Sequence, residues 1–353
     1  MPPEPTVTVG MAVYNGAATI AESIRSVLDE SFTDIELLLV DDGSTDDSCA
    51  VIESFTDPRL RLLRNDGNQG LVATRNRIVR EARGRYLAWL DQDDLSAADR
   101  MQTQVAYLDS HPQVALCAGW TAMLVGEATN PSRSIERYPQ SAQAIRATML
   151  FLNPIACNTV MMRQEPLRGA EPFRTSFGNS LDYDLWSRMS DTLEIVNLPK
   201  VLGSYRIHAG QTSQGAALAR MNRHALDVQI ELAERAMALR MSTADEEVHG
   251  RATTAPLEID DADLLASIAD WFTRLRAANG AAQTGRSFDR RSFDQALTRQ
   301  WTTVCLAARR SLGSTVAARA ALSGARRIGL PASAVLASVR EGVARRQGRA
   351  GVR

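Results

Sequence analysis

The sequence predicts an α/β protein with a Rossmann-like, mostly parallel sheet, followed by a mainly helical C-terminal region. Over the first hundred residues, apolar stretches of strand length alternate with stretches whose apolar residues recur at helical spacing. Such alternation is typical of parallel strands joined by right-handed crossovers. After about residue 210 the chain is rich in alanine and arginine and keeps only the helical spacing. We therefore expect a first domain over 1–213 and a helical region over 214–353, with linkers near 241–259 and 283–291.

The elements of the first domain are expected in a regular order. Val7–Val13 alternates apolar with smaller or polar residues, and Ile35–Val40 is a continuous apolar run that is typical of a central, buried strand. Two further strands are expected at Leu60–Leu63 and Tyr86–Leu90. Helices are predicted at 20–28, around 51–52, between Gly70 and Gly84, at 101–108 and at 181–189, and Gly84 is expected to end the third in a left-handed conformation.

Polar clusters follow three of the four predicted strands, at the point where each strand ends. Tyr14-Asn15 follows the first strand, Asp41-Asp42 the second and Asp91–Asp94 the fourth. In open α/β sheets, ligands bind outside the carboxyl ends of the strands. We therefore expect these three clusters to line one binding site.

The overall composition excludes several classes of protein. The chain has 353 residues and a net charge of −1, which argues against nucleic acid as a partner because nucleic-acid-binding domains are usually basic. Four scattered cysteines suit reduced thiols in a cytoplasmic protein rather than a disulfide framework or a zinc site. No signal peptide or membrane-spanning stretch is expected.

The charge is unevenly distributed along the chain. Residues 315–353 hold eight arginines and one glutamate and carry +7, so residues 1–314 carry −8. Within this tail, 331–349 can form a basic amphipathic helix, and such a helix can lie on an anionic membrane surface as a peripheral contact at the inner face of the membrane. Alternatively, it packs on the body of the protein or forms a homo-oligomer contact.

The acidic segment Asp91-Gln92-Asp93-Asp94 has the spacing of a cation site. In extended chain, residues two apart point to one side and lie roughly 6.5–7 Å apart. Two carboxylates so placed can hold a divalent cation, and Mg²⁺ prefers a few carboxylates together with substrate phosphates. The alternative is a solvated loop in which Asp94 only begins a helix. Asp41-Asp42-Gly43-Ser44 also has two interpretations: a turn with a helix cap, or a carboxylate that binds a nucleobase or ribose.

Asp182 is the candidate general base. On a helix it shares a face with Leu185, Trp186 and Met189, whereas Asp184 points to the opposite side. Burial on that face would raise the pKa of Asp182 toward values useful for a base, although the first turn of a helix favours the charged form. The alternative is that Asp182 only supports the start of its own helix.

Two arginines and a histidine complete the set of candidates. Arg75 and Arg206 could bind a diphosphate because a guanidinium matches phosphate oxygens, although either could be a solvated surface residue. His208 closely follows Arg206 in the sequence, but a lone histidine is more often structural than a ligand.

Together these residues form a pattern that resembles the family 2 glycosyltransferases, the inverting enzymes of GT-A fold. The resemblance covers about residues 6–213. It rests on six segments in the family's order and spacing: TVTVGMAVYNGAATIAESIRSVL, IELLLVDDGSTDDS, NQGLVATRN, GRYLAWLDQDD, LDYDLWSRM and YRIHAGQTS. A departure is Leu181, because many relatives have Glu before the catalytic Asp, and this makes acceptor contacts there doubtful.

The resemblance implies roles for most of the candidate residues. Tyr14 and the backbone near Ala12 would lie against the nucleobase, Asp42 would bind that base, and Arg75 would approach the nucleotide. Within the acidic segment, one carboxylate, assigned here to Asp91, would face the ribose, and Asp93 or Asp94 would bind Mg²⁺ or Mn²⁺. Asp182 would be the catalytic base, and His208 would close over the diphosphate or touch the metal.

The implied function is metal-dependent, inverting, non-processive transfer of a sugar from a nucleotide-sugar donor, with UDP or dTDP as the nucleotide. The acceptor would be a hydroxyl of a glycan or a lipid-linked glycan in cell-envelope polysaccharide or glycolipid synthesis. Polymerisation is not expected, because the Q-x-x-R-W motif of processive synthases is absent. A nucleotidylyltransferase would need a Gly-rich, Lys-containing loop where Val13–Ala18 stands. A non-catalytic nucleotide-sugar-binding or scaffold protein stays open because of Leu181.

Overall fold

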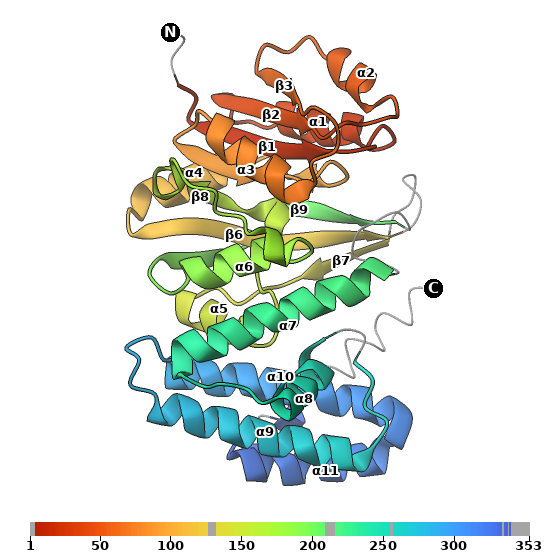
Figure 1. The fold of residues 1–353 in the computed structure, drawn as a ribbon, viewed down its shortest axis with the longest axis vertical. Coiled ribbons are helices and arrows are strands. Elements are labelled where there is room, and N and C mark those ends of the chain that lie inside the picture. The colour runs from red at the N-terminus through yellow and green to blue at the C-terminus, as the bar shows by residue number, and fades with distance from the viewer. Residues whose placement is uncertain are drawn as a thin grey trace. The chain divides into compact units, whose positions relative to one another are not determined.

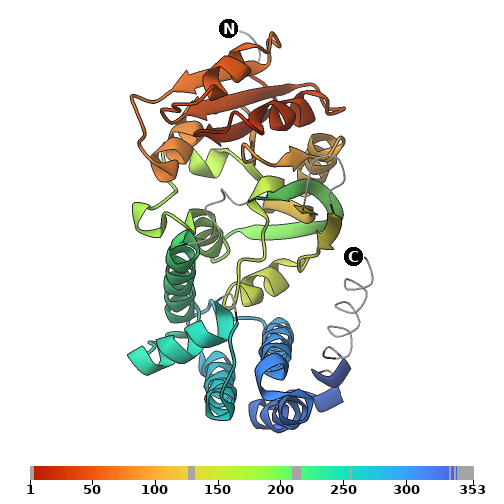
Figure 2. The ribbon, with the colours of Figure 1, turned by 90° about the vertical axis from the view of Figure 1, so that its right-hand side faces the viewer.

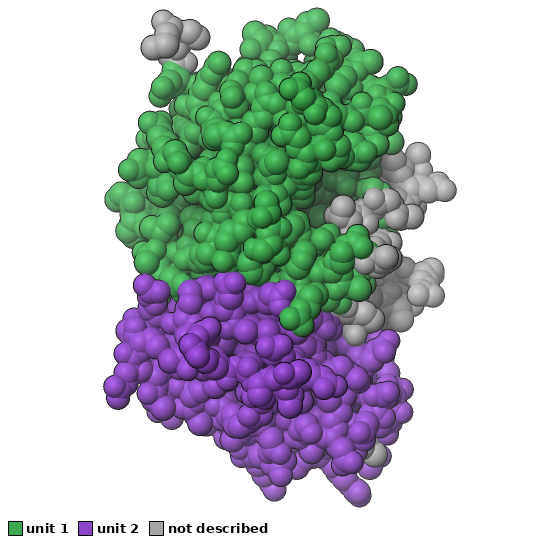
Figure 3. All heavy atoms as spheres, viewed as in Figure 1, with its two compact units in different colours: residues 1–145, 154–224 green, residues 146–153, 225–353 purple. Residues whose placement is uncertain are grey.

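The structure is a computed structural model that describes residues 4–125, 132–208, 216–254, 257–333, 335–337 and 339. The chain forms two compact units, coloured separately in Figure 3. Unit 1 comprises residues 1–145 and 154–224, and unit 2 comprises 146–153 and 225–353. The division falls later in the chain than the boundary expected at 213, and most of the amphipathic helix predicted at 331–349 lies outside the described residues.

Unit 1 is built on one sheet, in which nine strands are formed by the described residues (Figure 1). The strands are β1 (Val7–Val13), β2 (Ile35–Asp41), β3 (Leu60–Arg64), β4 (Tyr86–Trp89), β5 (Leu95–Ser96), β6 (Val114–Val125), β7 (Ser132–Glu136), β8 (Met161–Arg163) and β9 (Glu194–Ile207). Their order across the sheet is β3-β2-β1-β4-β8-β6-β9-β5, and β7 pairs with β6.

The first four strands are parallel, as expected, but the rest of the sheet is mixed. β1 pairs in parallel with β2 and β4, and β2 with β3. β8 runs antiparallel to both β4 and β6, and β5 and β7 are also antiparallel to their neighbours. The prediction of a mostly parallel sheet holds for β1 to β4 and for the long β6–β9 pair, whereas β5, β7 and β8 run antiparallel to their neighbours and make the sheet mixed.

Helices cover both faces of this sheet (Figure 1, Figure 2). They are α1 (Ile20–Leu28), α2 (Ser48–Glu53), α3 (Leu71–Glu81), α4 (Arg100–Ser110) and α6 (Leu181–Met189), while α5 (Ala142–Thr148) crosses the unit boundary. Val9 and Met11 of β1 belong to one core cluster with residues of α1, α2 and α4. Gly10, which points to the opposite face, lies against Ile78 of α3. The helices predicted from apolar spacing are therefore confirmed.

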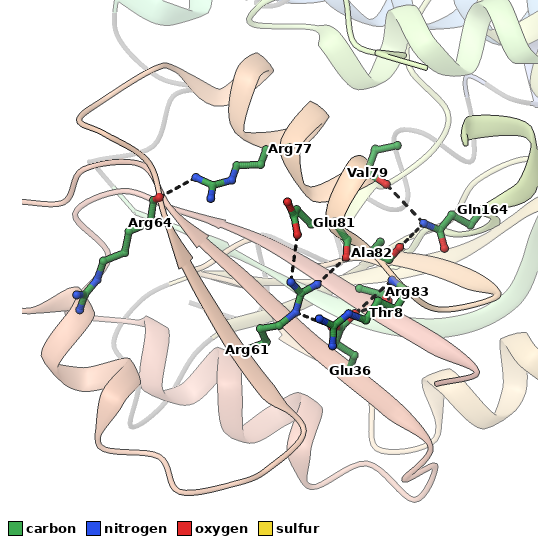
Figure 4. A network of polar contacts seen from close by, with 10 residues as sticks. All are labelled: Thr8, Glu36, Arg61, Arg64, Arg77, Val79, Glu81, Ala82, Arg83 and Gln164. Carbon is green, nitrogen blue, oxygen red and sulfur yellow. Dashed lines mark hydrogen bonds and ion pairs between the residues drawn. The ribbon is translucent and has the colours of Figure 1, made fainter. Parts of the chain in front are cut away.

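Helix α3 is held firmly at its C-terminal end (Figure 4). Arg61 donates to the Glu81 carbonyl at 2.6 Å, and the Gln164 amide donates to the Ala82 carbonyl at 2.6 Å, so two terminal carbonyls that lack helical partners are satisfied. Gly84 does not have the left-handed conformation expected of it. Its lack of a side chain matters instead because a Cβ would lie 2.4 Å from the Thr8 amide nitrogen.

Unit 2 is helical throughout its described residues. Its helices are α8 (Thr243–Thr253), α9 (Ala262–Ala281), α10 (Arg290–Leu312) and α11 (Ser314–Ile328), while α7 (Ala216–Met237) begins in unit 1. Trp271, Phe272, Phe293 and Trp301 are almost completely buried in its core. No helix among the described residues is both long enough and apolar enough to cross a membrane.

A helix, α8, occupies most of the segment expected to be a linker at 241–259. It begins with a capping box, because the Ser242 hydroxyl accepts from the Asp245 amide while the Asp245 carboxylate accepts from the Ser242 amide. The sequence did not predict α8 because its residues are mostly polar and lack apolar spacing, whereas the capping box stabilises its first turn. The second expected linker, near 283–291, falls on the connection between α9 and α10.

Candidate active site

The loops after β1, β2 and β4 are joined to one another by side-chain hydrogen bonds. The Gln92 amide pairs with both backbone groups of Tyr14: Oε1 accepts from its N–H at 2.9 Å and Nε2 donates to its carbonyl at 3.0 Å. The Asn15 side chain accepts from the Thr45 amide at 2.8 Å. The three polar clusters predicted from the sequence therefore lie together at the carboxyl ends of the parallel strands.

The β1 side of this site presents an open surface for a flat ligand. Tyr14 is 44% exposed, which is unusual for a large aromatic residue that directly follows a buried strand. Ala12, half-buried near the end of β1, pairs with Val40 of β2. The backbone predicted to lie against a nucleobase is thus part of the central sheet.

Asp42 is buried and anchors the loop that leads into α3. Its carboxylate accepts from the Asn65 side chain at 2.6 Å and from the backbone amides of Gln69 and Gly70 at 2.9 and 2.8 Å. An ionised carboxylate can accept about four hydrogen bonds, so little capacity is left for the base contact expected of it. Asp41 accepts from the amides of Gly43 and Ser44, which is the turn interpretation of that cluster.

Arg75 is buried at the centre of the site. Its guanidinium donates to Asp91 at 2.8 Å, and its carbon Cζ lies 5.4 Å from the ring centre of Trp89 and 5.9 Å from that of Phe173. Cys157 lies against the same group at 3.4 Å. These neighbours enclose the Arg75 guanidinium, so its position is fixed by protein contacts, and the predicted contact with a nucleotide stays a prediction.

Asp93 and Asp94 differ in their surroundings although they are adjacent. Asp93 Oδ2 lies 2.9 Å from His208 Nε2, whereas Asp94 Oδ1 accepts from the Arg206 amide at 3.0 Å. Asp94 Oδ2 is buried without a hydrogen-bond partner. Burial raises the pKa of both carboxyl groups, and repulsion from Asp91 adds to the effect in each case.

Asp93, Asp94 and His208 are of residue types that can bind a divalent cation. Asp93 Oδ2 and His208 Nε2 lie 2.9 Å apart and form a hydrogen bond with each other. The unpartnered oxygen of Asp94 and the raised pKa values indicate negative charge that lacks compensation. Across the described part of the chain, no three His, Cys, Asp or Glu side chains converge as a complete cage, so phosphate oxygens and water would complete the coordination.

Arg206 holds the acidic loop in place. Its Nε donates to the Asp93 carbonyl at 3.1 Å, and its Nη2 donates to Glu22 of α1 at 2.5 Å. Through its backbone amide it also binds Asp94. These contacts give Arg206 a structural role in holding the Asp91–Asp94 loop, and its predicted contact with a nucleotide stays a prediction.

Asp182 lies in the first turn of α6 and is half-buried. Burial raises the pKa of Asp182, and the positive charge of Arg75 partly opposes this shift. Asp184, expected on the opposite face, is almost completely buried and binds both Arg174 and Arg188. Asp184 is buried although it lies on the opposite face from Asp182, because nearly all sides of α6 are covered by the protein. Neither acid is fully exposed to solvent.

The site also contains residues that sequence reasoning missed. They are Asn76, Trp89, Gln92, Cys157, Asn158 and Phe173. Asn76 and Gln92 lie inside the segments that carried the resemblance, so their position was a usable signal. Phe173 and Cys157 come from irregular parts of the chain, where no pattern pointed to them.

The mixed sheet with flanking helices has the GT-A fold of the glycosyltransferase structures that it resembles. Residues 8–168 match the family model described as "Glycosyl transferase family 2", so this region of the chain belongs to that family. Similar structures include Staphylococcus aureus TarS 1–349 in complex with UDP-GlcNAc (TM-score 0.54, 14% identity, 92% of each chain covered). The mannosyltransferase PcManGT from Pyrobaculum calidifontis, in complex with GDP-Man and Mn²⁺, has a TM-score of 0.53 at 16% identity, covering 92% of this chain and 88% of that one.

Curated relatives match part of the chain. WfgD from Escherichia coli, named as a UDP-Glc:alpha-D-GlcNAc-diphosphoundecaprenol beta-1,3-glucosyltransferase, is 28% identical over 210 residues, which are 59% of this chain and 79% of the relative. The succinoglycan biosynthesis protein ExoO from Rhizobium meliloti is 39% identical over 106 residues, 30% of each chain. The solved structures, at their low identity, support the fold alone.

Proposed function

We propose that this protein is an inverting, non-processive glycosyltransferase that moves one sugar from a nucleotide-sugar donor to an acceptor hydroxyl. The observation that carries the proposal is the position of Asp182, a carboxylate close enough to Arg75 and Asp91 for their charges to influence its pKa. It thus stands beside the acidic loop that would bind the donor. A base beside a leaving nucleotide diphosphate is the arrangement that a single displacement needs.

In the proposed reaction, the acceptor oxygen forms a bond to the anomeric carbon as the bond from that carbon to the diphosphate breaks. Asp182 takes the proton of the acceptor hydroxyl. The raised pKa of Asp182 suits this task, because a base is most effective when its pKa lies near the working pH. Arg75 holds Asp91 in place at 2.8 Å, so the donor loop stays fixed during the displacement.

Asp93, Asp94 and His208 are the residues proposed to hold Mg²⁺ or Mn²⁺. A bound divalent cation would supply charge stabilisation for the departing diphosphate. Tyr14 and Ala12 are proposed to face the base, Asp91 the ribose, and Asp42, Arg75 and Arg206 to shape the nucleotide site through the contacts described above.

The donor is proposed to be a UDP- or dTDP-sugar, and the acceptor a glycan or lipid-linked glycan of the cell envelope. WfgD, by its printed name, uses UDP-Glc and a diphosphoundecaprenol acceptor, and TarS was solved with UDP-GlcNAc, both of which support this choice. A lipid-linked acceptor is consistent with a cytoplasmic protein that works at the inner face of the membrane.

The alternative is a non-catalytic nucleotide-sugar-binding protein. It is favoured by Leu181, which is 3% exposed and places a buried apolar side chain directly before Asp182. Only the enzyme needs Asp182 as a base, so replacing Asp182 distinguishes the two proposals.

The test is transfer from UDP-, dTDP- and GDP-sugars to lipid-linked glycan acceptors with Mn²⁺ or Mg²⁺, for the wild type and Asp182→Asn. We expect Asp182→Asn to bind nucleotide with unchanged affinity, measured by titration calorimetry, and to lose about 10²- to 10⁴-fold in kcat. Asp29→Asn, at an exposed acid, is the control and should transfer normally. Equal transfer by Asp182→Asn would exclude Asp182 as the base, and no transfer by the wild type with any donor would favour the binding protein.

A further inference from the structure

The side chain of Asn76 forms a reciprocal pair of hydrogen bonds with the backbone of one distant residue. Its Nδ2 donates to the Phe173 carbonyl at 2.9 Å, and its Oδ1 accepts from the Phe173 amide at 3.0 Å. Asn76 is 5% exposed and Phe173 is 3% exposed. Leaving a buried backbone group without a hydrogen-bond partner costs about 1–3 kcal/mol of stability. The Asn76 side chain therefore makes it favourable to bury the Phe173 backbone against α3.

The Phe173 ring, once placed, closes over the floor of the site. It packs edge-on against Trp89 with ring centres 5.6 Å apart and planes at 78°. The Arg75 guanidinium lies within 6 Å of both rings, in the range of cation–π attraction. Two adjacent residues of α3 thus contact different parts of the site: Arg75 binds Asp91 in the loop after β4, and Asn76 holds the segment at Phe173.

The segment at Phe173 is in turn tied to the helix that carries the base. Arg174 donates from Nε to Asp184 at 3.0 Å, and Arg188 of α6 donates to the Pro172 carbonyl at 2.5 Å. These two contacts flank Phe173 in sequence and end on α6, two and six residues beyond Asp182. A displacement of Phe173 would therefore be passed to α6.

We propose that Asn76 is a positioning residue that fixes the base-bearing helix α6 against the donor site. This rests on the proposed function, because it assigns Asn76 a role in the alignment of Asp182 with the donor. Misplacing a reacting group by about 1 Å can reduce a rate 10²-fold. A purely structural role would instead lower stability and leave the kinetics of the folded enzyme unchanged.

The test compares Asn76→Ala with two matched amide variants. Gln92→Ala removes the equivalent reciprocal pair on the donor side, at Tyr14. Asn197→Ala removes a buried amide whose contacts, with the carbonyls of Pro139 and Pro154, lie elsewhere in unit 1. Asn76→Asp keeps the volume and the acceptor and loses the donor, so it serves if Asn76→Ala does not fold.

We expect Asn76→Ala and Asn76→Asp to lower kcat about 10- to 100-fold and raise the acceptor KM, with nucleotide Kd within about twofold of wild type. Gln92→Ala should do the opposite: it should raise the nucleotide Kd and leave kcat close to that of the wild type. Asn197→Ala should lower Tm and leave kcat and nucleotide Kd unchanged. An unchanged kcat in both Asn76 variants, or a parallel loss of kcat and nucleotide affinity, would overturn the proposal.

Backbone hydrogen exchange provides a readout that does not depend on transfer. Asn76→Ala should speed exchange over residues 172–184 and leave residues 12–17 protected, and Gln92→Ala should do the reverse. If the wild type transfers no sugar, the proposed function fails while exchange still decides whether Asn76 fixes α6. Unchanged exchange over 172–184 would refute the positioning role.

Discussion

Both units bury neutral polar side chains, but only unit 1 also buries charged ones among the described residues. In unit 1 the buried set contains charged groups, among them Asp94, Arg75, Arg100 and Glu30, and burial raises the pKa of both acids. In the described part of unit 2 the buried polar side chains are Thr148, Gln229, His249, Asn279, Gln300 and Thr302, none of which carries a formal charge at neutral pH.

This difference shows which unit is organised for chemistry. Burying a charge without full compensation is costly, and perturbed pKa values gather at functional sites for that reason. The pairing of neutral donors and acceptors in unit 2 is typical of a region selected for packing. Stability and activity should therefore respond in opposite directions when a buried acid of the site in unit 1 is replaced, and stability alone should respond in unit 2.

The largest expected effect comes from Asp94→Asn. A carboxyl group whose pKa is raised by folding is destabilising above its unfolded pKa, because the folded protein holds that charge less favourably than the unfolded chain does. Asparagine removes the charge, so unit 1 should become more stable at pH 7. Cation-dependent nucleotide affinity should fall about 10²- to 10³-fold, since a carboxylate of the proposed cation site is lost.

Urea unfolding and nucleotide titration with and without Mn²⁺ measure the two effects of Asp94→Asn. Asp66→Asn, at an exposed acid, is the control and should change neither quantity. A variant with lower stability and unchanged cation dependence would show that Asp94 is a structural acid and would remove this contrast between the units.

The second effect is an acid-dependent loss of stability in unit 2, caused by His249. The ring is fully buried, accepts from the Trp271 indole N–H at 3.0 Å and lies 3.1 Å from the Leu150 carbonyl. Burial lowers the pKa of His249 from 6.5 to about 4. Below pH 6.5 His249 is protonated in the unfolded chain but stays neutral in the folded unit until the pH approaches 4. The free energy of unfolding should therefore fall by about 3 kcal/mol between pH 6.5 and pH 4.

Comparing urea unfolding of the wild type and His249→Gln at pH 7.5 and pH 4.5 isolates this contribution. The amide of glutamine can accept and donate as the neutral ring does but does not titrate in this range. His249→Gln should lose less stability on acidification than the wild type. Identical losses in the two proteins would mean that His249 does not control the acid stability of unit 2.

The sequence was sufficient to predict what depends on local spacing. The parallel strands β1 to β4 and helices α1 to α4 follow from apolar periodicity, and the polar clusters at the strand ends follow from topology. The pairing of His208 with Asp93 joins residues 115 positions apart, and that of Asn76 with Phe173 joins residues 97 apart. No periodic pattern records such contacts, so the inner partners of the site emerge only from the folded chain.

Asp42 and Arg75 show the same limit of sequence-based prediction. Asp42 and Arg75 were assigned to the nucleotide by their types and by the resemblance, and both assignments stay proposals. In the structure each is surrounded by protein partners, because a carboxylate or guanidinium at a crowded strand end binds whichever backbone amide or acid is nearest. Residue type predicts which bonds a side chain can make, but the choice of partner depends on the tertiary fold.

The smallest expected effect comes from Ser242→Ala at the start of α8. Its hydroxyl accepts from the Asp245 amide, and Asp245 in turn accepts from Arg274 at 2.6 Å. Loss of a serine N-cap costs about 1 kcal/mol, and the polar sequence of α8 offers little apolar burial to offset it. Ser267→Ala, which removes an exposed hydroxyl inside α9, is the control. Faster hydrogen exchange confined to α8 would show that a neutral cap, rather than buried charge, maintains this part of unit 2, and unchanged exchange would place its stability in packing alone.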